Sequence, residues 1–208
     1  MRRIAESTVR RLSLYLSFLE EIEAQGAATT SSDDLAHLGG TTSAQVRKDL
    51  SFFGSFGKRG LGYSVPELST RLREILGLGR QWRVCIVGAG RIGAALAGYA
   101  GFTERGFIVS AVYDSDPAKI GTRLADTIIS DESHLDRDVA ANKYQIAVLA
   151  VPADAAQKLA DRAVRAGIKG ILNFAPVQIN VPDHVALRAV NMAMELEALT
   201  FAITNNFD

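Results

Sequence analysis

The stretch WRVCIVGAGRIG, residues 82–93, decides the fold of the larger part of the chain. Its first six residues are an apolar run with the length of a buried strand, and the next six form a G-x-G-x-x-G fingerprint. An alanine-rich segment predicts a helix over about 91–100, and a second apolar run over 107–113 ends at Asp114, 21 positions after Gly93. Strand, fingerprint, helix, second strand and terminal acid, in this order, predict a Rossmann dinucleotide-binding unit.

The fingerprint also predicts which residues hold the dinucleotide. Gly88 permits a tight turn, Gly90 lets the pyrophosphate approach the main chain, and Gly93 lets the helix pack on the strand. We expect Asp114 to accept hydrogen bonds from the adenine-ribose hydroxyls and to repel a 2′-phosphate, which favours NAD(H) over NADP(H). Further strands expected at 146–151 and 170–173 should add residues near the nicotinamide at their carboxyl ends. The candidate cofactor residues are Gly88, Ala89, Gly90, Arg91, Ile92, Gly93, Asp114, Val151, Pro152, Asn173, Phe174 and Ala175.

The first 80 residues have a different, helical pattern. Apolar spacing predicts a helix over 7–24, a short helix over 33–38 with Leu35 and Leu38 facing inward, and a third helix that begins at Thr41, Thr42 or Ser43 and runs to about Phe52. The glycine-rich stretch 54–65 is typical of a β-hairpin with a basic tip, and a helix over about 67–77 follows Pro66. The prediction is therefore a winged helix-turn-helix domain over 1–80, a Rossmann domain over 81–191 and a C-terminal helix over 192–208, which together make an α/β protein.

The third helix and the hairpin predict a DNA-binding surface. Polar and basic side chains of the helix should point outward, where arginine and glutamine can pair with base edges in the major groove. Cations on a thin hairpin can reach phosphates or the minor groove. Each feature alone also fits a solvated helix face or a plain loop, but their succession within about 30 residues favours DNA. The candidate DNA-binding residues are Ser43, Gln45, Arg47, Lys48, Ser51, Lys58, Arg59 and Gly60.

Composition narrows the class of protein. The 208 residues carry 23 Lys and Arg against 23 Asp and Glu, which argues against a strongly basic nucleic-acid coat protein. The single cysteine excludes an intramolecular disulfide and favours a reducing compartment. The N-terminus lacks the apolar core of a signal peptide, and no apolar run is long enough to span a membrane, so we expect a cytoplasmic protein with no membrane partner.

Sensor and enzyme remain alternatives at this point. The last expected strand ends at Asn173, and the 35 residues that follow it are too few for a substrate domain. Neither His134 nor His184 lies in a catalytic motif. A small NAD(P)H-dependent reductase with an N-terminal interaction module is the rival, and a CoA-type nucleotide-binding protein is a third possibility. The apolar tail over about 192–205 must pack on its own sheet or on a partner subunit; dimerisation is favoured, because helix-turn-helix proteins usually bind palindromes as two-fold dimers.

Three long motifs and the fingerprint together closely resemble the Rex family of redox-sensing transcriptional repressors: QVRKDLS (45–51), FGSFGKRGLGY (53–63), GAGRIG (88–93) and GIKGILNFAP (167–176). The resemblance spans nearly the whole chain. It implies a homodimer with a C-terminal helix swapped between subunits, which is not an enzyme. It also implies binding to palindromic operator DNA when the NADH/NAD ratio is low, and release by NADH. Tyr99 matches a tyrosine that the family places after the fingerprint helix, and this match adds Tyr99 to the candidate cofactor residues.

The chain departs from the family pattern at one place. Members similar to it use an arginine in the first helix and an aspartate in the last strand as a redox-dependent ion pair. These positions match Ser17 and Asn191, and a phenylalanine beside the aspartate matches Met192. We therefore expect either a switch that rests on steric closure and domain rotation or a weaker redox discrimination. In the first case, an apolar pocket around the nicotinamide (Phe174, Ala175, Pro176 and Met192) disfavours the charged NAD ring.

Overall fold

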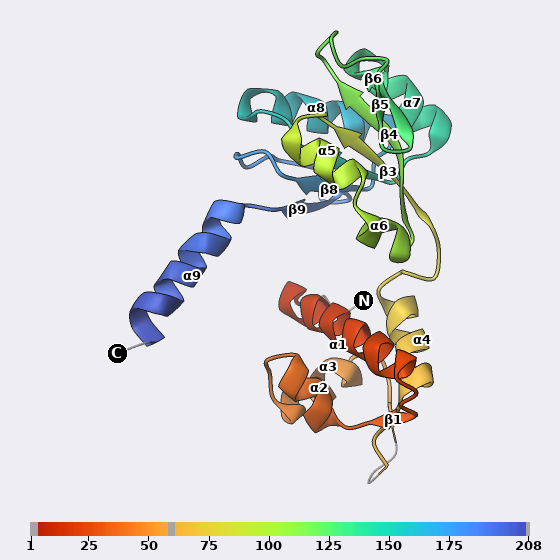
Figure 1. Cartoon of the computed structure of the whole chain (residues 1–208), viewed down its shortest axis with the longest axis vertical. Coiled ribbons are helices and arrows are strands. Elements are labelled where there is room, and N and C mark those ends of the chain that lie inside the picture. Colours follow the sequence, from red (N-terminus) through yellow and green to blue (C-terminus); the bar gives the residue numbers. More distant parts are fainter. Residues whose placement is uncertain (1–3, 58–60, 207–208) are drawn as a thin grey trace. The chain divides into compact units, whose positions relative to one another are not determined.

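A computed structural model describes residues 4–57 and 61–206 of the chain (Figure 1). The chain divides into two compact units, one up to Arg80 and one from Gln81 onward. The first is mainly helical, and the second is built on a parallel sheet. The predicted α/β fold class is thereby confirmed.

The N-terminal unit contains four helices and a two-stranded sheet within its described residues: α1 (Glu6–Ala24), β1 (Thr29–Thr30), α2 (Ser32–Leu38), α3 (Ser43–Ser51), β2 (Tyr63–Ser64) and α4 (Val65–Ile75). Two local signals start the middle helices. The Ser31 hydroxyl accepts the N–H of Asp34 while the Asp34 carboxylate accepts the N–H of Ser31, which is a capping box. The Thr42 hydroxyl accepts the N–H of Gln45 at the start of α3.

The core of this unit forms between α1 and α4, with α2 and α3 packed beneath them. The apolar stripe predicted for the first helix is buried, and Leu35, Val46 and Leu50 complete the core from α2 and α3. The inward position expected for Leu38 is wrong, because Leu38 is the last residue of α2 and its side chain is exposed. The chain turns away at Gly39 and Gly40, where Gly40 has a positive φ of 57° that favours glycine.

The wing differs from the expected hairpin in its described part. Residues 54–57 form no strand, and Tyr63–Ser64 pairs instead with Thr29–Thr30 in an antiparallel register. The two arms still approach each other, because a Cβ on Gly57 would collide with the carbonyl oxygen of Gly62. The returning arm is thus held by the segment before α2, which anchors the wing to the helix-turn-helix.

The C-terminal unit is a seven-stranded sheet in the order β5-β6-β4-β3-β7-β8-β9, parallel except for the β5–β6 pair. Its strands are β3 (Trp82–Val87), β4 (Phe107–Asp114), β5 (Arg123–Leu124), β6 (Thr127–Asp131), β7 (Ile146–Leu149), β8 (Gly170–Asn173) and β9 (Ala186–Ala189). Its helices are α5 (Arg91–Ala97), α6 (Ala100–Glu104), the short 3₁₀ turn Glu132–His134, α7 (Leu135–Asn142), α8 (Ala153–Ala166) and α9 (Met192–Asn206).

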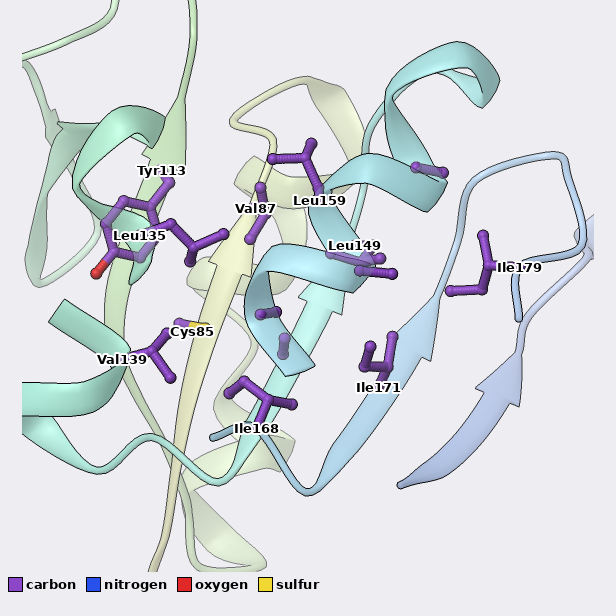
Figure 2. Close-up of a cluster of buried hydrophobic side chains, with 14 of the residues drawn as sticks. Cys85, Val87, Tyr113, Leu135, Val139, Leu149, Leu159, Ile168, Ile171 and Ile179 are labelled. Atoms are coloured by element: carbon purple, nitrogen blue, oxygen red, sulfur yellow. The ribbon is translucent and has the colours of Figure 1, made fainter. Parts of the chain in front are cut away.

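Alternate residues of the central strand serve opposite faces of the sheet. Cys85 and Val87 point into a cluster beneath α7 and α8, where Figure 2 shows Cys85 beside Val139 and Val87 beside Leu159. Val84 and Ile86 belong to a second cluster on the other face, to which α5 contributes. This alternation is what a central strand buried on both sides requires. The sheet therefore fixes the carboxyl ends of β3, β4, β7 and β8 along one edge.

The structure corrects three expectations about this unit. The single helix expected over 91–100 is broken, because α5 ends at Ala97 and α6 begins at Ala100. The strand expected over 146–151 ends at Leu149. The sheet also does not end at Asn173, because β9 pairs parallel with β8. Residues 186–189 carry no alternating pattern of their own, so their strand conformation follows from pairing with β8.

The last helix, α9, leaves its large apolar side chains exposed to solvent. Six large apolar side chains along it are between 54% and 70% exposed: Met192, Met194, Leu196, Leu199, Phe201 and Ile203. Over the described residues, the helices are too short or too polar for any of them to cross a membrane.

Candidate functional site: a dinucleotide loop and a recognition helix

The glycine fingerprint occupies the turn from β3 to α5. Gly88 has a positive φ of 99°, and a Cβ there would collide with the carbonyl oxygen of Ala150, the residue that follows the neighbouring strand β7. A Cβ on Gly93 would collide with the carbonyl oxygen of Gly88, so α5 can pack on β3 only with glycine at this position. Gly90, the N-cap of α5, has open space where its Cβ would lie. The backbone at Gly88 and Gly93 thus has the tight turn and the close packing typical of this fingerprint, and the side of Gly90 is open.

Asp114 ends β4 and lies beside this loop. The residue is 8% exposed, and its Oδ2 accepts the N–H of Ala89 at 2.7 Å. Its Oδ1 accepts the N–H of Asp116 at 2.9 Å. Main-chain hydrogen bonds therefore hold the carboxylate beside the fingerprint. An acid in this position can accept hydrogen bonds from ribose hydroxyls.

A cation that the sequence reasoning missed, Lys119, lies beside Asp114 and Asp116. These three residues form a charged group at the end of β4, here called the corner. The Lys119 ammonium donates to Asp114 Oδ2 at 3.0 Å and lies 3.8 Å from Asp116 Oδ2. Burial alone would raise the pKa of Asp114, but the N–H of Asp116, the Lys119 ammonium and the N–H of Ala89 outweigh it and hold this pKa below its usual value. Asp114 is therefore ionised at neutral pH. The signal that could have revealed Lys119 is its position five residues after the acid, within a loop that returns to the same strand end.

The later strands bring the other cofactor candidates to the same sheet edge. In the register of the sheet, Val87 pairs with Tyr113 and with Leu149, and Leu149 pairs with Asn173. Asn173 itself is buried, and its side-chain amide is used within its own loop. It accepts the N–H of Ala175 at 3.0 Å and donates to the carbonyl of Val177 at 2.9 Å. Asn173 thus shapes the loop that carries Phe174 and Ala175. The remaining candidates there are the half-buried Val151 and the exposed Pro152.

The apolar pocket expected around the nicotinamide is not enclosed by one chain. Phe174 is half-buried and Ala175 is buried, but Pro176 is exposed and Met192 is 66% exposed. Tyr99 is 58% exposed and lies between α5 and α6, with its ring edge-on to Phe102 at 5.2 Å. These side chains would need a further surface to exclude water from a nicotinamide.

Ser17 and Asn191, where the family pattern has charges, are both exposed. Asn191 has a local task, since its side-chain oxygen accepts the N–H groups of Ala193 and Met194 at 3.0 and 3.3 Å. It therefore caps the N-terminus of α9, a role for which asparagine is well suited.

The candidate DNA-reading helix is α3. Arg47, Lys48 and Ser51 are exposed, as predicted, and Ser43 is half-exposed at the first turn. The Arg47 guanidinium donates to the Ser32 hydroxyl at 2.9 Å, which links α3 to the start of α2. The Ser51 hydroxyl donates to the carbonyl of Lys48 at 2.7 Å. The exposed face of α3 therefore presents two cations.

The opposite face of α3 carries a buried carboxylate. Asp49 is 0% exposed and accepts from Arg11 Nε at 2.6 Å, from Arg11 Nη2 at 2.8 Å and from the Tyr15 hydroxyl at 3.1 Å. Thr8 donates to it at 3.3 Å. Burial opposes its ionisation, but the hydrogen bonds from Arg11 and Gln45 prevail and lower its pKa. The same network raises the pKa of Tyr15 to about 12, through burial first and the Asp49 charge second. This network fixes α3 on α1.

The outward position expected for Gln45 needs correction. Its side-chain Nε2 donates to Asp49 Oδ1 at 2.8 Å, one turn along the helix, so Gln45 is turned toward the buried network and is only half-exposed. An ionised carboxylate accepts and does not donate, which forces the nitrogen of the amide toward Asp49. The three wing candidates, Lys58, Arg59 and Gly60, lie outside the described residues.

The described residues hold neither a reactive cysteine nor a cluster arranged to bind a metal ion. Burial raises the pKa of the Cys85 thiol to about 12, as expected for a core residue and not for a reactive thiolate. Across residues 4–57 and 61–206, His, Cys, Asp and Glu form no group of three or more arranged to hold a metal ion.

Comparisons with known proteins cover both units. A family model described as a CoA binding domain matches residues 79–177, and one described as a putative DNA-binding protein N-terminus matches residues 3–51. The redox-sensing transcriptional repressor Rex of Thermus thermophilus is 50% identical over 203 residues, which cover 98% of this chain and 95% of the relative.

Solved structures agree over the full length. RSP, a Rex-family repressor, in complex with NAD⁺ and operator DNA superposes with a TM-score of 0.93 at 37% identity, over 99% of this chain and 95% of that one. RSP in complex with NADH superposes with a TM-score of 0.90 at 35% identity, over 99% of this chain and 97% of that one. The match thus includes the helical unit and the sheet unit together.

Proposed function

Because this chain belongs to the Rex family of redox-sensing transcriptional repressors, we propose that it binds operator DNA through its N-terminal unit and leaves that DNA when NADH occupies its C-terminal unit. Members of this family are repressors and not enzymes. The observation that carries the proposal is the match of one chain, over 99% of its length, to a protein solved with both NAD⁺ and operator DNA.

The exposed face of α3 supports the DNA part of the proposal. Arg47 and Lys48 are exposed on a helix whose other side is fixed by Asp49 and Leu50, so the cations stand on a rigid base. Arginine pairs bidentately with guanine in the major groove, and lysine contacts guanine or phosphate. We assign Arg47 to base reading and Lys48 to a base or a phosphate. Ser43 and Ser51 flank them as hydrogen-bonding groups, and Lys58, Arg59 and Gly60 of the wing remain candidates for backbone contacts.

The corner at Asp114 supports NADH as the effector. An ionised acid that is buried, tied to the fingerprint through Ala89 and placed at a strand end has the chemistry to accept ribose hydroxyls. A CoA-type ligand is the alternative that the description of one family model raises. CoA carries a 3′-phosphate on its ribose, so the same acid would repel it, and the proposal is NADH.

We further propose a homodimer in which α9 packs on the partner subunit. One observation is the row of exposed apolar side chains along α9. The second is an apolar cavity of about 270 Å³ on the sheet, lined by residues that include Val148, Leu172 and Phe107. An exposed apolar helix and an apolar cavity on one chain fit a self-complementary interface between two copies. Removing the apolar side chain of Phe201, as in Phe201→Asp, should convert the dimer to a monomer in light scattering.

The switch we propose is a two-state dimer. NADH and NAD differ by one charge at the nicotinamide, so a site that excludes water binds the uncharged ring more tightly. The pocket residues Pro176 and Met192 are exposed in one chain, which makes closure of the dimer around the cofactor a requirement of this mechanism. A full reversal from 1:99 to 99:1 needs roughly 5.5 kcal/mol of differential binding. By reciprocity, operator DNA should weaken NADH binding by the factor by which NADH weakens DNA binding.

The experiment is a titration of NADH, and separately of NAD, into the protein bound to a fluorescent palindromic operator of the type that the family uses. Release by NADH at far lower concentration than NAD supports a redox sensor that works with Ser17 and Asn191. Tight DNA binding without an NADH/NAD difference removes the redox part. Failure to bind specific DNA, with substrate-dependent NADH oxidation, would replace the proposal by a reductase. Asp114→Ala serves as the matched variant, because it should still bind the operator but need more NADH for release.

A further inference from the structure

Lys119 is the charged side chain that faces the ribose-accepting acid. Its ammonium lies 3.0 Å from Asp114 Oδ2, and its side chain is 38% exposed, so it stands at the open rim of the corner. We propose that Lys119 lowers the discrimination of this site against a 2′-phosphate, so that NADPH binds as a weaker second ligand of the same site. This inference rests on the proposed role of Asp114 as the ribose acceptor.

The hydrogen bonds of Asp114 leave limited room for a ribose. Each carboxylate oxygen can accept about two hydrogen bonds. Oδ2 already accepts from Ala89 and Lys119, whereas Oδ1 accepts from Asp116 alone among the interactions of the described residues. A ribose hydroxyl can therefore bind Oδ1 without moving Lys119. The ammonium then stays beside the 2′ and 3′ positions, where a phosphate on the ribose would meet it.

The charges of the corner depend on Lys119. Asp114 and Asp116 together carry two negative charges, and the Lys119 ammonium lies 3.0 Å and 3.8 Å from their oxygens. Hydrogen bonding to Asp114 raises the pKa of Lys119, so the ammonium is charged at neutral pH. Without Lys119, a 2′-phosphate would meet two uncompensated carboxylates. With it, the local charge is minus one and a cation is within reach of the phosphate.

Lys119 is not needed to orient the acid. Two main-chain N–H groups, of Ala89 and Asp116, hold the Asp114 carboxylate whatever residue stands at 119. Removal of the ammonium should therefore leave the acceptor for the ribose hydroxyls in place. The effect of Lys119 is electrostatic, which separates it from Asp114, whose removal deletes the acceptor itself.

The test is calorimetric titration of the full-length protein and its Lys119→Met variant with NADH and NADPH. We expect the variant to bind NADPH roughly tenfold more weakly and NADH within about threefold of the unaltered protein. We expect the loss for NADPH to shrink near 1 M salt, where the screening length is about 3 Å. A merely structural role of Lys119 would move both ligands equally and would not depend on salt. ADP-ribose and its 2′-phosphate should repeat the pattern, since they lack the nicotinamide.

Two control variants sharpen the result. Lys119→Arg keeps the charge and should restore NADPH binding, and Lys158→Met removes an exposed lysine of α8 and should change neither ligand. Equal losses of NADH and NADPH affinity in Lys119→Met would overturn the inference, as would an unaltered protein that takes no NADPH at millimolar concentration. An unaltered protein that binds neither dinucleotide would instead overturn the proposed function and this inference with it.

Discussion

The two units each contain a buried aspartate with a lowered pKa, and the two are held in different ways. Asp49, in the helical unit, accepts from four side chains, those of Thr8, Arg11, Tyr15 and Gln45. Asp114, in the sheet unit, accepts from two main-chain N–H groups and one lysine. Asp49 is 0% exposed, whereas Asp114 is 8% exposed at the end of a strand.

The difference shows what each acid is available to do. The partners of Asp49 come from α1 and from its own helix and surround it, so its charge is used to join two helices. The main chain orients Asp114, and its Oδ1 keeps capacity for a further donor. A low pKa alone therefore does not separate a structural carboxylate from a binding one. The identity of the donors does, because backbone donors at a strand end leave side-chain space free for a ligand.

The largest effect that tests this comparison is expected from Asp49→Ala. It would leave the Arg11 guanidinium, 22% exposed, without its carboxylate partner at the α1–α3 contact. Breaking a buried ion pair from one side costs about 3 kcal/mol or more. We expect the helical unit to lose about that much free energy of unfolding in urea, measured by circular dichroism.

The sheet unit provides the control for this variant. NADH affinity, measured on the same preparation, should stay unchanged, because Asp49 belongs to the other unit. A loss of less than about 1 kcal/mol would mean that the network contributes no more than an exposed ion pair.

The second effect is on binding and not on folding. Asp114→Ala removes the acceptor for the ribose hydroxyls, and hydrogen bonds to a charged group contribute about 2 kcal/mol, or roughly a thirtyfold loss of NADH affinity. It also leaves Lys119 without its nearest acid, so NADPH should bind better than before. Calorimetry with both dinucleotides measures this. Unaltered NADH binding would show that Asp114 is not the ribose acceptor and would break the comparison.

The two acids also differ in whether the sequence predicts their environment. The fingerprint and Asp114 are predicted because their roles depend on local geometry: a turn, a close packing and a strand end within one β-α-β segment. Asp49 has no predicted role, because nothing near it in the sequence indicates its partner Arg11, 38 residues earlier. A buried polar network is a property of packing between distant segments, so it requires the structure.

The same distinction holds for the fold. Apolar runs predict β3 and β4, and helical apolar spacing predicts the helix-turn-helix. In contrast, β9 and the β1–β2 pair form from short segments that are strands only because a neighbour pairs with them. The outward position predicted for the Gln45 side chain is wrong for a related reason. Helical spacing places it near the outer face, but the Asp49 carboxylate, one turn away, draws its amide inward.

Within α3, the exposed Arg47 contrasts with the buried Asp49. Arg47→Ala removes an exposed cation that donates one hydrogen bond among the described residues, from Nη1 to the Ser32 hydroxyl, which leaves its other guanidinium N–H groups for DNA. We expect a loss of about 1.5 kcal/mol in operator affinity and weaker discrimination among base pairs, measured by fluorescence anisotropy on operator variants. Ser32→Ala is the control, because it removes the α2–α3 contact and keeps the charge. An equal loss on random DNA would reassign Arg47 to a phosphate contact.

The smallest expected difference lies in the response to acid. The folded-state pKa values of Asp49 and Asp114 are both lowered, so each contributes stability that is present above the unfolded value of about 3.9 and is lost as pH falls through the folded value. In the helical unit, protonation of Asp49 leaves Arg11 unpaired. In the sheet unit, Asp114→Asn should remove part of the acid sensitivity at some cost at neutral pH, because the amide keeps one oxygen for the N–H of either Ala89 or Asp116 and turns an –NH2 group toward the other. Urea unfolding from pH 7 to about pH 3 should therefore show a weaker pH dependence of the helical transition in Asp49→Asn and of the sheet transition in Asp114→Asn. If Asp49→Asn keeps the full acid sensitivity of the helical unit, the Asp49 charge does not stabilise the α1–α3 contact, and the two acids differ in burial alone.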